Sequence, residues 1–417
     1  MHNKGFILPG VLFLGFYLIY FFGSFSRIPF GDCIGFVADT EKGDFVMSTS
    51  TYAHFLFTNT LIVLKKIFSF VESSEIGRFL VITSSCASLV LLYKTVLTLT
   101  RDYFSSFFSA VIFGLSFTFW RNSEIIEIYT FNLVWIALFL LFSVKFLLTQ
   151  KGTPLLLASL FLGISLFSHI QNILMVPALL LLLIWSRDQR TSLSSLLIFA
   201  FSVLALISVP LLKGEPVAGV FSTGTVLDTF QYAAVIKSFA GAVGYIFYNF
   251  WYFVLFSVLG LIHMYKNHYR IFLFFISAAV PVFLFSVIFS VSDNYVFFLP
   301  FNFILAILCG VGICRMKERK AVRIIAFSSL LVPAFYWISL AVASTTEHGK
   351  AFGERKSYKG GLSYYMLPWM KNNVGILEFT IDGRTAPDRM EWMTKSAEEF
   401  IRLKKAQGYS LEEIRKL

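Results

Sequence analysis

The feature that most constrains this chain is a series of apolar runs, each close to the length that crosses a lipid bilayer. A transmembrane helix needs about 20 mainly apolar residues. The chain is therefore predicted to be all-α and to form a polytopic bundle of membrane-spanning helices. Matching the runs to that length predicts about eleven spans, at residues 6–23, 79–99, 104–120, 125–148, 154–168, 171–186, 192–212, 241–264, 271–290, 294–314 and 322–343.

Composition excludes the main alternatives. Of the 417 residues, 57% are hydrophobic and only 14% are charged, whereas about 25% are charged in soluble domains. A water-facing surface needs more charge than this, which argues against a soluble enzyme and rules out a disordered chain. The net charge of +11 does not indicate a nucleic-acid partner, because excess Lys and Arg in membrane proteins sit in cytoplasmic loops.

Basic loops predict the orientation of the bundle. The densest cluster of Lys and Arg lies at residues 315–323, and smaller clusters lie at 266–270 and 187–190. Placing all three in the cytoplasm agrees with the number of spans between them. The N-terminus is then cytoplasmic, the C-terminus is extracytoplasmic, and residues 24–78 form a long first outer loop.

Part of that loop is apolar but is not expected to cross the bilayer. Residues 52–70 contain Lys65 and Lys66 side by side, and two adjacent lysines are costly inside a span. A helix that lies along the outer interface is the better interpretation.

The C-terminal part of the chain differs sharply in composition. Residues 344–417 hold 23 charged residues among 74, whereas residues 1–343 hold only 36. We therefore predict a transmembrane bundle over 1–343 and a small extracytoplasmic soluble tail over 344–417, too small for a core of its own and packed on the bundle. Within the tail, apolar spacing predicts a helix over 388–406, and Ser410 with Glu413 resembles a capping box.

Polar residues at the predicted outer face are the candidates for chemistry. Asp32 follows the first span, Glu127 lies at the start of the fourth, and His169 lies between the fifth and sixth. Taken alone, each residue also fits a plainer role. Asp32 fits a solvated turn residue or a helix N-cap, Glu127 fits an acid in the first turn of a helix, and His169 fits an interfacial residue. The Phe- and Tyr-rich stretch 245–256 is interpreted as a lipid-facing or packing surface and not as a sugar platform.

Two other classes of membrane protein fit poorly. The middles of the predicted spans are nearly free of acidic residues, which argues against an ion-coupled carrier. No P-loop or G-x-G-x-x-G motif opens a helix, which argues against a nucleotide-driven pump.

Three segments together resemble a family of multi-pass membrane proteins related to protein O-mannosyltransferases, within the GT-C class of glycosyltransferases. The resemblance covers roughly residues 1–185. Its members carry a Gly-Asp motif after the first span, a Phe-Trp stretch leading to Glu-x-Tyr-x-x-Asn, and a later His before an apolar run. The matching segments here are Phe30-Gly31-Asp32-Cys33, Ser116 to Trp120 followed by Glu127 to Asn132, and Ser168-His169-Ile170-Gln171.

The resemblance implies a GT-C-like fold and a specific activity. Such enzymes take a sugar from a polyprenyl-phosphate-linked donor and transfer it to a hydroxyl acceptor, a protein Ser/Thr or a glycan, on the extracytoplasmic face. The implied partners are the lipid-linked donor, the acceptor and membrane lipids. The implied location is the bacterial inner membrane. A lipid-linked donor needs no soluble nucleotide site, so no cofactor is expected.

The resemblance also assigns candidate site residues. Asp32 matches the acid of the first outer loop that serves as the base, and a carboxylate within reach can take the proton of an attacking hydroxyl. Glu127, Tyr129 and Asn132 are implied to shape the site by holding the first loop or the sugar. His169 is implied to contact the phosphate or the loop.

Arg121 is a further candidate on charge alone. It is a cation at the same face, suited to a phosphate, and an interfacial anchor explains it equally well. The carboxylates are too scattered to define a metal site, so metal use stays open. Two non-enzymatic alternatives also stay open: a carrier or flippase of lipid-linked sugars, and a scaffold subunit of an envelope assembly.

Overall fold

The computed structural model describes residues 4–50, 53–221, 232–289 and 294–417. Over these ranges all regular secondary structure is helical, as the sequence predicts. Eleven segments correspond to the predicted spans. They are α1 (Lys4–Gly23), α4 (Ser73–Thr100), α5 (Tyr103–Gly114) with α6 (Phe117–Glu124), α7 (Ile128–Thr149), α8 (Gly152–Ser168), η1 (Ile170–Met175) with α9 (Val176–Trp185), α10 (Gln189–Lys213), α12 (Tyr232–Phe250) with α13 (Val254–Asn267), α14 (Tyr269–Ile288), η3 (Asn294–Phe298) with α15 (Leu299–Met316), and α16 (Lys320–Phe327) with η4 (Ser328–Leu331) and α17 (Val332–Thr345).

The lengths of these segments fit a membrane protein. In the described chain, seven helices are long and apolar enough to cross a membrane, and the pair α5–α6, bent by 66°, makes an eighth if it counts as one span. Three further apolar helices are shorter. The predicted fold class, a polytopic helical bundle, is therefore confirmed.

The tightest contact in the bundle joins α13 and α15 through two glycines. A Cβ on Gly260 would lie 1.9 Å from the backbone oxygen of Leu308, and one on Gly312 would lie 2.0 Å from that of Phe256. The two backbones thus touch, and only glycine leaves room for them. Small residues allow this close approach in membrane bundles, where water does not drive helices together.

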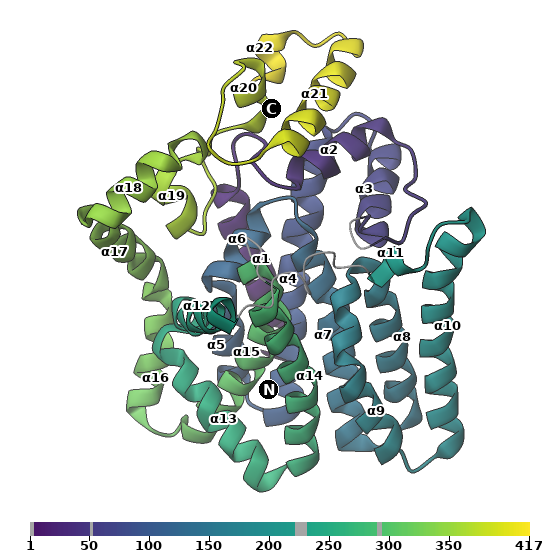
Figure 1. Cartoon of the computed structure of the whole chain (residues 1–417). Coiled ribbons are helices and arrows are strands. Elements are labelled where there is room, and N and C mark those ends of the chain that lie inside the picture. Colours follow the sequence, from purple (N-terminus) through teal and green to yellow (C-terminus); the bar gives the residue numbers. More distant parts are fainter. Residues whose placement is uncertain (1–3, 51–52, 222–231, 290–293) are drawn as a thin grey trace.

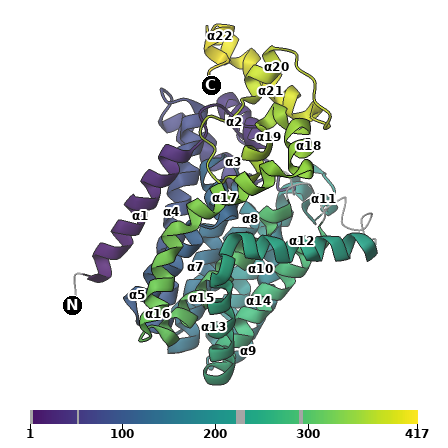
Figure 2. The ribbon, with the colours of Figure 1, turned by 90° about the vertical axis from the view of Figure 1, so that its left-hand side faces the viewer.

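The predicted span 241–264 is not a single straight helix. It breaks at η2 (Trp251–Phe253), where Trp251 has φ 50, a left-handed conformation that a continuing α-helix does not contain. α12 is seen end-on in Figure 1 and from the side in Figure 2, where it lies across the bundle while α13 runs along it. The sequence shows the apolar run but not this turn.

The two ends of the bundle differ in charge. The connections α9–α10, α13–α14 and α15–α16 lie at one end, together with the N-terminus (Figures 1 and 2). These connections contain the three basic clusters at 187–190, 266–270 and 315–323. The first loop and the tail lie at the opposite end, so the predicted grouping of basic loops agrees with the arrangement in space.

We call the described parts of residues 24–72, together with residues 346–417, the cap. Apolar side chains of both parts share one core, in which Ile28 and Phe30 of the first loop are buried with Ile376 and Phe379 of the tail. The tail therefore packs on the first loop, and neither part has a separate interior. The cap helices are α2 (Cys33–Lys42), α3 (Phe55–Ile67), α18 (Glu347–Arg355), η5 (Ser357–Lys359), α19 (Gly361–Met366), α20 (Ile376–Ile381), α21 (Glu391–Ala406) and α22 (Leu411–Ile414).

Two local expectations in the cap can be checked. The Ser410–Glu413 capping box is present, with both reciprocal hydrogen bonds, and the predicted helix 388–406 is found at Glu391–Ala406. α3 has 13 residues, about 20 Å of helix, which is too short to cross a bilayer. Figure 1 shows it in the cap above α8; its depth in the membrane interface stays a prediction.

Candidate functional site

A cavity of about 900 Å³ lies between the cap and the bundle. Five of the six residues that the sequence singled out line it, although they come from four separate parts of the chain. They are Asp32, Arg121, Glu127, Tyr129 and His169.

Asp32 stands at the entrance to α2. Gly31 precedes it with φ +135, a conformation open mainly to glycine. A Cβ on Gly31 would also lie 3.4 Å from Oε1 of Glu127. Asp32 occupies the N-cap position of α2, yet its side chain makes no capping hydrogen bond. The Gly-Asp motif thus lets the loop pass close to Glu127 and places the Asp32 carboxylate in the cavity wall. Helix capping does not explain why an aspartate occupies this position.

His169 lies between α8 and η1, with Tyr129 and Phe297 around it. Its ring is 6.1 Å from the ring of Tyr129 and 5.9 Å from that of Phe297. Nδ1 of His169 accepts a hydrogen bond of 3.2 Å from the backbone N–H of Gln171. Burial and then the nearby His54 lower the pKa of His169 to about 3. The ring is therefore neutral at physiological pH, and Nε2 is its N–H donor.

Asn132 is the one candidate that does not line the cavity. It is buried behind the cavity wall, where its Oδ1 accepts a 2.6 Å hydrogen bond from Nδ2 of Asn172. Nδ2 of Asn172 also donates to the backbone oxygen of Ser165, at 2.9 Å. Asn132 thus fastens the turn that carries His169, and its place in the fold does not suit direct contact with a sugar.

Arg121 lines the cavity but is also part of the cap contact. Its Nη1 donates to the backbone oxygens of Tyr364 and Leu367, the latter at 3.3 Å. The guanidinium lies 4.3 Å from the centre of the Tyr364 ring. This buried cation therefore ties α6 to the tail.

The rest of the Phe-Trp motif region serves the same contact. Nε1 of Trp120 donates to Glu124 at 2.5 Å, and the backbone N–H of Met370 donates to the same carboxylate at 2.8 Å. The rings of Trp120 and Trp369 are 5.4 Å apart. Glu124 is buried, so its carboxylate serves the contact between α6 and the tail and does not face water.

The sequence did not identify the tail as a wall of the cavity. Lys356, Lys359, Tyr364, Arg389 and Trp392 line it. The sequence offers only a general indication, because a charged tail too small for its own core has to pack on another part of the protein. No local pattern indicates which of its side chains meet residues more than 300 positions earlier.

The aromatic stretch on α12 has two faces. Tyr245, Tyr248 and Asn249 line the cavity, whereas Phe250 and Phe253 are buried in the bundle core. The interpretation as a packing surface is therefore right for one face only. Asn249 also accepts a hydrogen bond of 2.8 Å from the backbone N–H of Thr118, which joins α12 to α6.

The cavity wall contains both charged and apolar side chains. The charged side chains are those of Asp32, Arg121, Glu127, Lys356, Lys359, Asp388 and Arg389, and a group of apolar side chains comes from η1, η3 and the end of α14. The apolar side chains include Ile170, Ile173, Leu174, Phe285, Phe289 and Phe297. Such a cavity suits a ligand with a polar head and a hydrocarbon chain. Among the described residues, no group of three or more His, Cys, Asp or Glu side chains lies close enough to hold a metal ion.

Comparisons with known proteins agree with the expected relationship. Residues 45–192 match the family model described as Protein O-mannosyl-transferase TMEM260 N-terminal domain; Asp32 lies outside this segment. Comparison with curated proteins gave no match. Among solved structures, apo ArnT from Cupriavidus metallidurans superimposes with a TM-score of 0.53 and 16% identity, covering 83% of this chain and 66% of that chain. This chain thus spans slightly less than two thirds of ArnT, and the likeness is one of fold. The chain is a membrane protein of GT-C-like fold, and its residues 45–192 are similar to that O-mannosyltransferase domain.

Proposed function

We propose that the protein transfers a sugar from a polyprenyl-phosphate-linked donor to a hydroxyl acceptor, a protein Ser/Thr or a glycan, on the extracytoplasmic face of the membrane. The observation that carries this proposal is the mixed lining of the cavity, with the three acids Asp32, Glu127 and Asp388 and a group of apolar side chains on η1, η3 and α14. The family match and the ArnT-like fold support the glycosyltransferase class.

In the proposed reaction Asp32 is the general base. The acceptor hydroxyl gives its proton to the carboxylate as its oxygen attacks the anomeric carbon of the sugar. The bond between that carbon and the phosphate oxygen breaks, and the lipid phosphate leaves with the bonding electrons. Glu127, beside Gly31, helps to keep the loop and the acceptor in place, and Tyr129 borders the sugar.

The leaving phosphate needs a cation or hydrogen-bond donors. We assign this role to Lys359, a cation in the cavity wall, assisted by Nε2 of His169. Arg121 donates to backbone oxygens of the tail, and we assign it to the contact between α6 and the cap. Lys359 lines the cavity, with its ammonium 5.8 Å from the ring centres of Phe30 and Tyr358. Its flexible stem suits a phosphate that moves away as the bond breaks.

The sidedness rests on charge. The basic loops lie at the end of the bundle opposite the cap (Figure 1), and basic loops favour the cytoplasm. The cavity and the C-terminus then face outward. A cysteine introduced at the exposed Lys371 tests this: an impermeant thiol reagent should label it in intact cells, and labelling only after lysis reverses the orientation.

The activity is tested with the purified protein in lipid nanodiscs. Polyprenyl-phosphate mannose and a Ser/Thr peptide or a glycan should yield a glycosylated product, whereas a nucleotide-linked sugar should not. Lys359→Ala should raise the donor KM at least tenfold, with Lys350→Ala, an exposed lysine of α18, as the matched control. Movement of the intact donor across vesicles without any transfer would favour the carrier instead.

A further inference from the structure

We propose that the tail is a working part of the active site: it clamps the segment that carries Asp32, and Asn373 is the positioning residue. This inference rests on the proposed function, because it gives Asn373 its effect through Asp32.

The segment between α1 and α2, residues 24–32, lacks regular secondary structure, so its backbone groups need partners from elsewhere. The tail supplies them along almost the whole segment. The hydrogen bonds join Met370 N to Gly23 O (3.0 Å), Ser26 N and Arg27 N to Asn373 Oδ1 (3.0 and 3.3 Å), Asn373 Nδ2 to Arg27 O (2.7 Å), Ile28 N to Leu417 O (2.9 Å), Ile376 N to Ile28 O (2.9 Å) and Tyr364 Oη to Phe30 O (3.2 Å).

Asn373 is at the centre of this set. Its amide oxygen accepts from two consecutive backbone N–H groups, and its amide nitrogen donates to the backbone oxygens of Arg27 and Val374. Both the oxygen and the nitrogen of the side-chain amide thus have hydrogen-bond partners. At this side-chain length, only an amide supplies an acceptor oxygen beside a nitrogen with two protons to donate. An aspartate has the same size but would turn a second oxygen toward two carbonyl oxygens.

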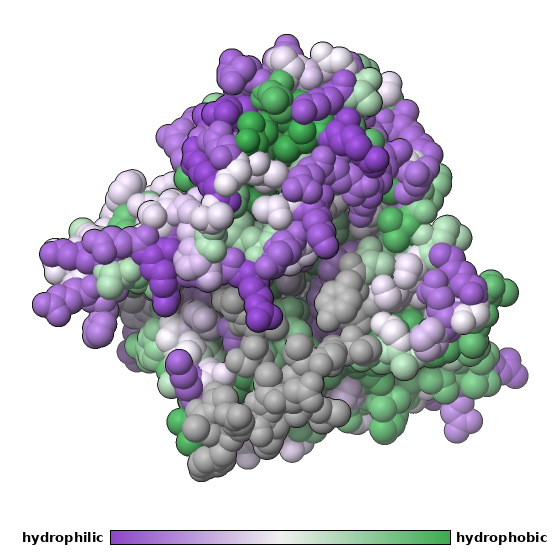
Figure 3. Space-filling model, turned by 45° about the horizontal axis from the view of Figure 1, so that its top comes forward, coloured by the Kyte–Doolittle hydropathy of each residue, from purple (hydrophilic) through white to green (hydrophobic). Residues whose placement is uncertain are grey.

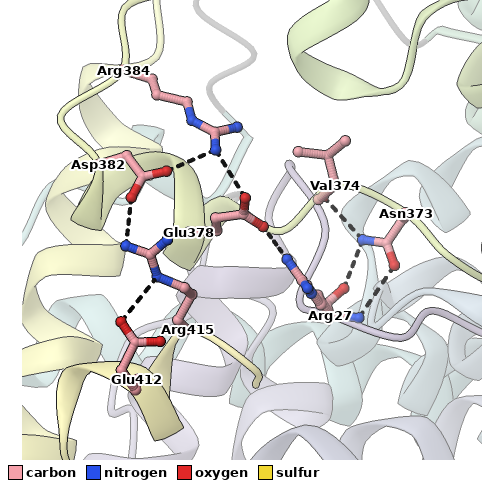
Figure 4. Close-up of polar contacts among 8 residues, drawn as sticks. All are labelled: Arg27, Asn373, Val374, Glu378, Asp382, Arg384, Glu412 and Arg415. Carbon is pink, nitrogen blue, oxygen red and sulfur yellow. Dashed lines mark hydrogen bonds and ion pairs between the residues drawn. The ribbon is translucent and has the colours of Figure 1, made fainter.

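A chain of ion pairs on the cap surface begins at Arg27, next to Asn373. Figure 4 shows Arg27 of the segment paired with Glu378, which also binds Arg384. Asp382 then joins Arg384 to Arg415. These pairs are partly exposed, so each adds little stability, but together they fix how the tail faces the segment.

The clamp lies directly before the catalytic carboxylate. Phe30 is held between the tail and the core, with its ring 5.4 Å from that of Phe379, and Gly31 leads from it to Asp32. A shift of the segment therefore moves the base relative to the donor, which is held by other walls. Misplacement by about 1 Å can cost up to about a hundredfold in rate.

The experiment uses the full-length protein with Asn373→Ala and Asn373→Asp. Hydrogen exchange at the amides of Ser26 and Arg27 should become at least tenfold faster, while exchange in α7 stays unchanged. kcat should fall about tenfold or more, with the donor KM within twofold of wild type. Lys371→Ala, at an exposed neighbouring position, is the control for both readouts.

The decisive arm combines Asn373→Ala with Asp32→Asn. If Asn373 acts through Asp32, adding Asn373→Ala to the Asp32→Asn protein should not lower kcat further. An equal loss in both backgrounds, or unchanged exchange at Ser26 and Arg27, overturns the proposal. If the wild-type protein transfers no sugar, the proposed function fails, and the exchange measurement alone decides whether the clamp exists.

Discussion

The bundle and the cap are held together by different forces. The bundle relies on apolar packing and on glycines that let α13 and α15 touch. The cap also has an apolar core, but it adds ion pairs and hydrogen bonds between segments far apart in the sequence. Figure 3 shows the same contrast on the surface, with mainly hydrophilic side chains over the cap and hydrophobic ones on the flank of the bundle. We infer from this difference that the polar contacts of the cap position the proposed reacting groups against the wall that the bundle supplies.

The centre of the cap is a buried ion cluster. The side chain of Lys404 on α21 is 1% exposed, and its Nζ lies 2.6 Å from Glu72 and 3.1 Å from Glu41. Gln407 and Ser73 also donate to Glu41. This cluster joins the tail to α2 and to the N-terminal end of α4.

The largest effect on stability is expected from Lys404→Met. Removing one partner of a buried pair leaves its carboxylates without compensation and typically costs about 3–5 kcal/mol. The free energy of opening of α21, measured by hydrogen exchange, should fall by that amount while the bundle helices stay protected. Lys405→Met, at the exposed neighbouring position, should change little. If Lys405→Met lowered the free energy of opening of α21 as much as Lys404→Met, net charge and not this cluster would hold the cap.

The largest effect on activity is expected from Asp32→Asn. The amide keeps the size of the carboxylate but cannot take a proton, so transfer should fall at least about a hundredfold. The thermal midpoint should barely change, because Asp32 does not cap α2. The control variants Asp39→Asn and Asp44→Asn, in the same part of the cap, should lower the transfer rate much less. Near-normal transfer by the Asp32→Asn protein would remove the base assignment.

The bundle should respond to volume and not to charge. Gly260→Ala places a methyl group 1.9 Å from the Leu308 oxygen, and overpacking of this kind costs about 1–3 kcal/mol. The thermal midpoint of the bundle in detergent should fall, with hydrogen exchange in α21 unaffected. Gly244→Ala has open space within 4 Å and is the matched control. If α21 opens as well, the two regions are not independent.

The buried cluster should make the stability of the cap depend on pH. Burial opposes the ionised form of Glu41, but hydrogen bonds from Ser73 and Gln407 and the charge of Lys404 lower its pKa below the ordinary 4.5. The stability this carboxylate adds is therefore complete above pH 4.5 and is lost as pH falls through the lowered value. Protection of α21 should be level near neutral pH and should decline in acid. Lys404→Met should flatten that decline.

The sequence predicted the parts of the molecule that depend on local pattern. Apolar run length gave the spans, and short motifs identified Asp32 and Glu127, which the fold brings to one cavity. Run length did not reveal the break at Trp251, because a turn inside an apolar stretch leaves hydropathy unchanged. Lys359 and Asn373 were also missed, since their importance comes from pairing with residues near position 30 in the folded chain. The cap contacts depend on tertiary structure, whereas the spans depend on composition.

The smallest effect is expected from an exposed member of the ion-pair chain on the cap surface. Arg384 lies 2.8 Å from Glu378 and 2.7 Å from Asp382, but its side chain is 43% exposed. Water and salt screen such pairs, and they typically contribute about 0–1 kcal/mol. Arg384→Ala should therefore change the opening free energy of α21 by about 0.5 kcal/mol or less, and the change should shrink further as salt is raised. A loss as large as that of Lys404→Met would mean that the cap is held by its surface network, and the buried cluster would no longer be what distinguishes it from the bundle.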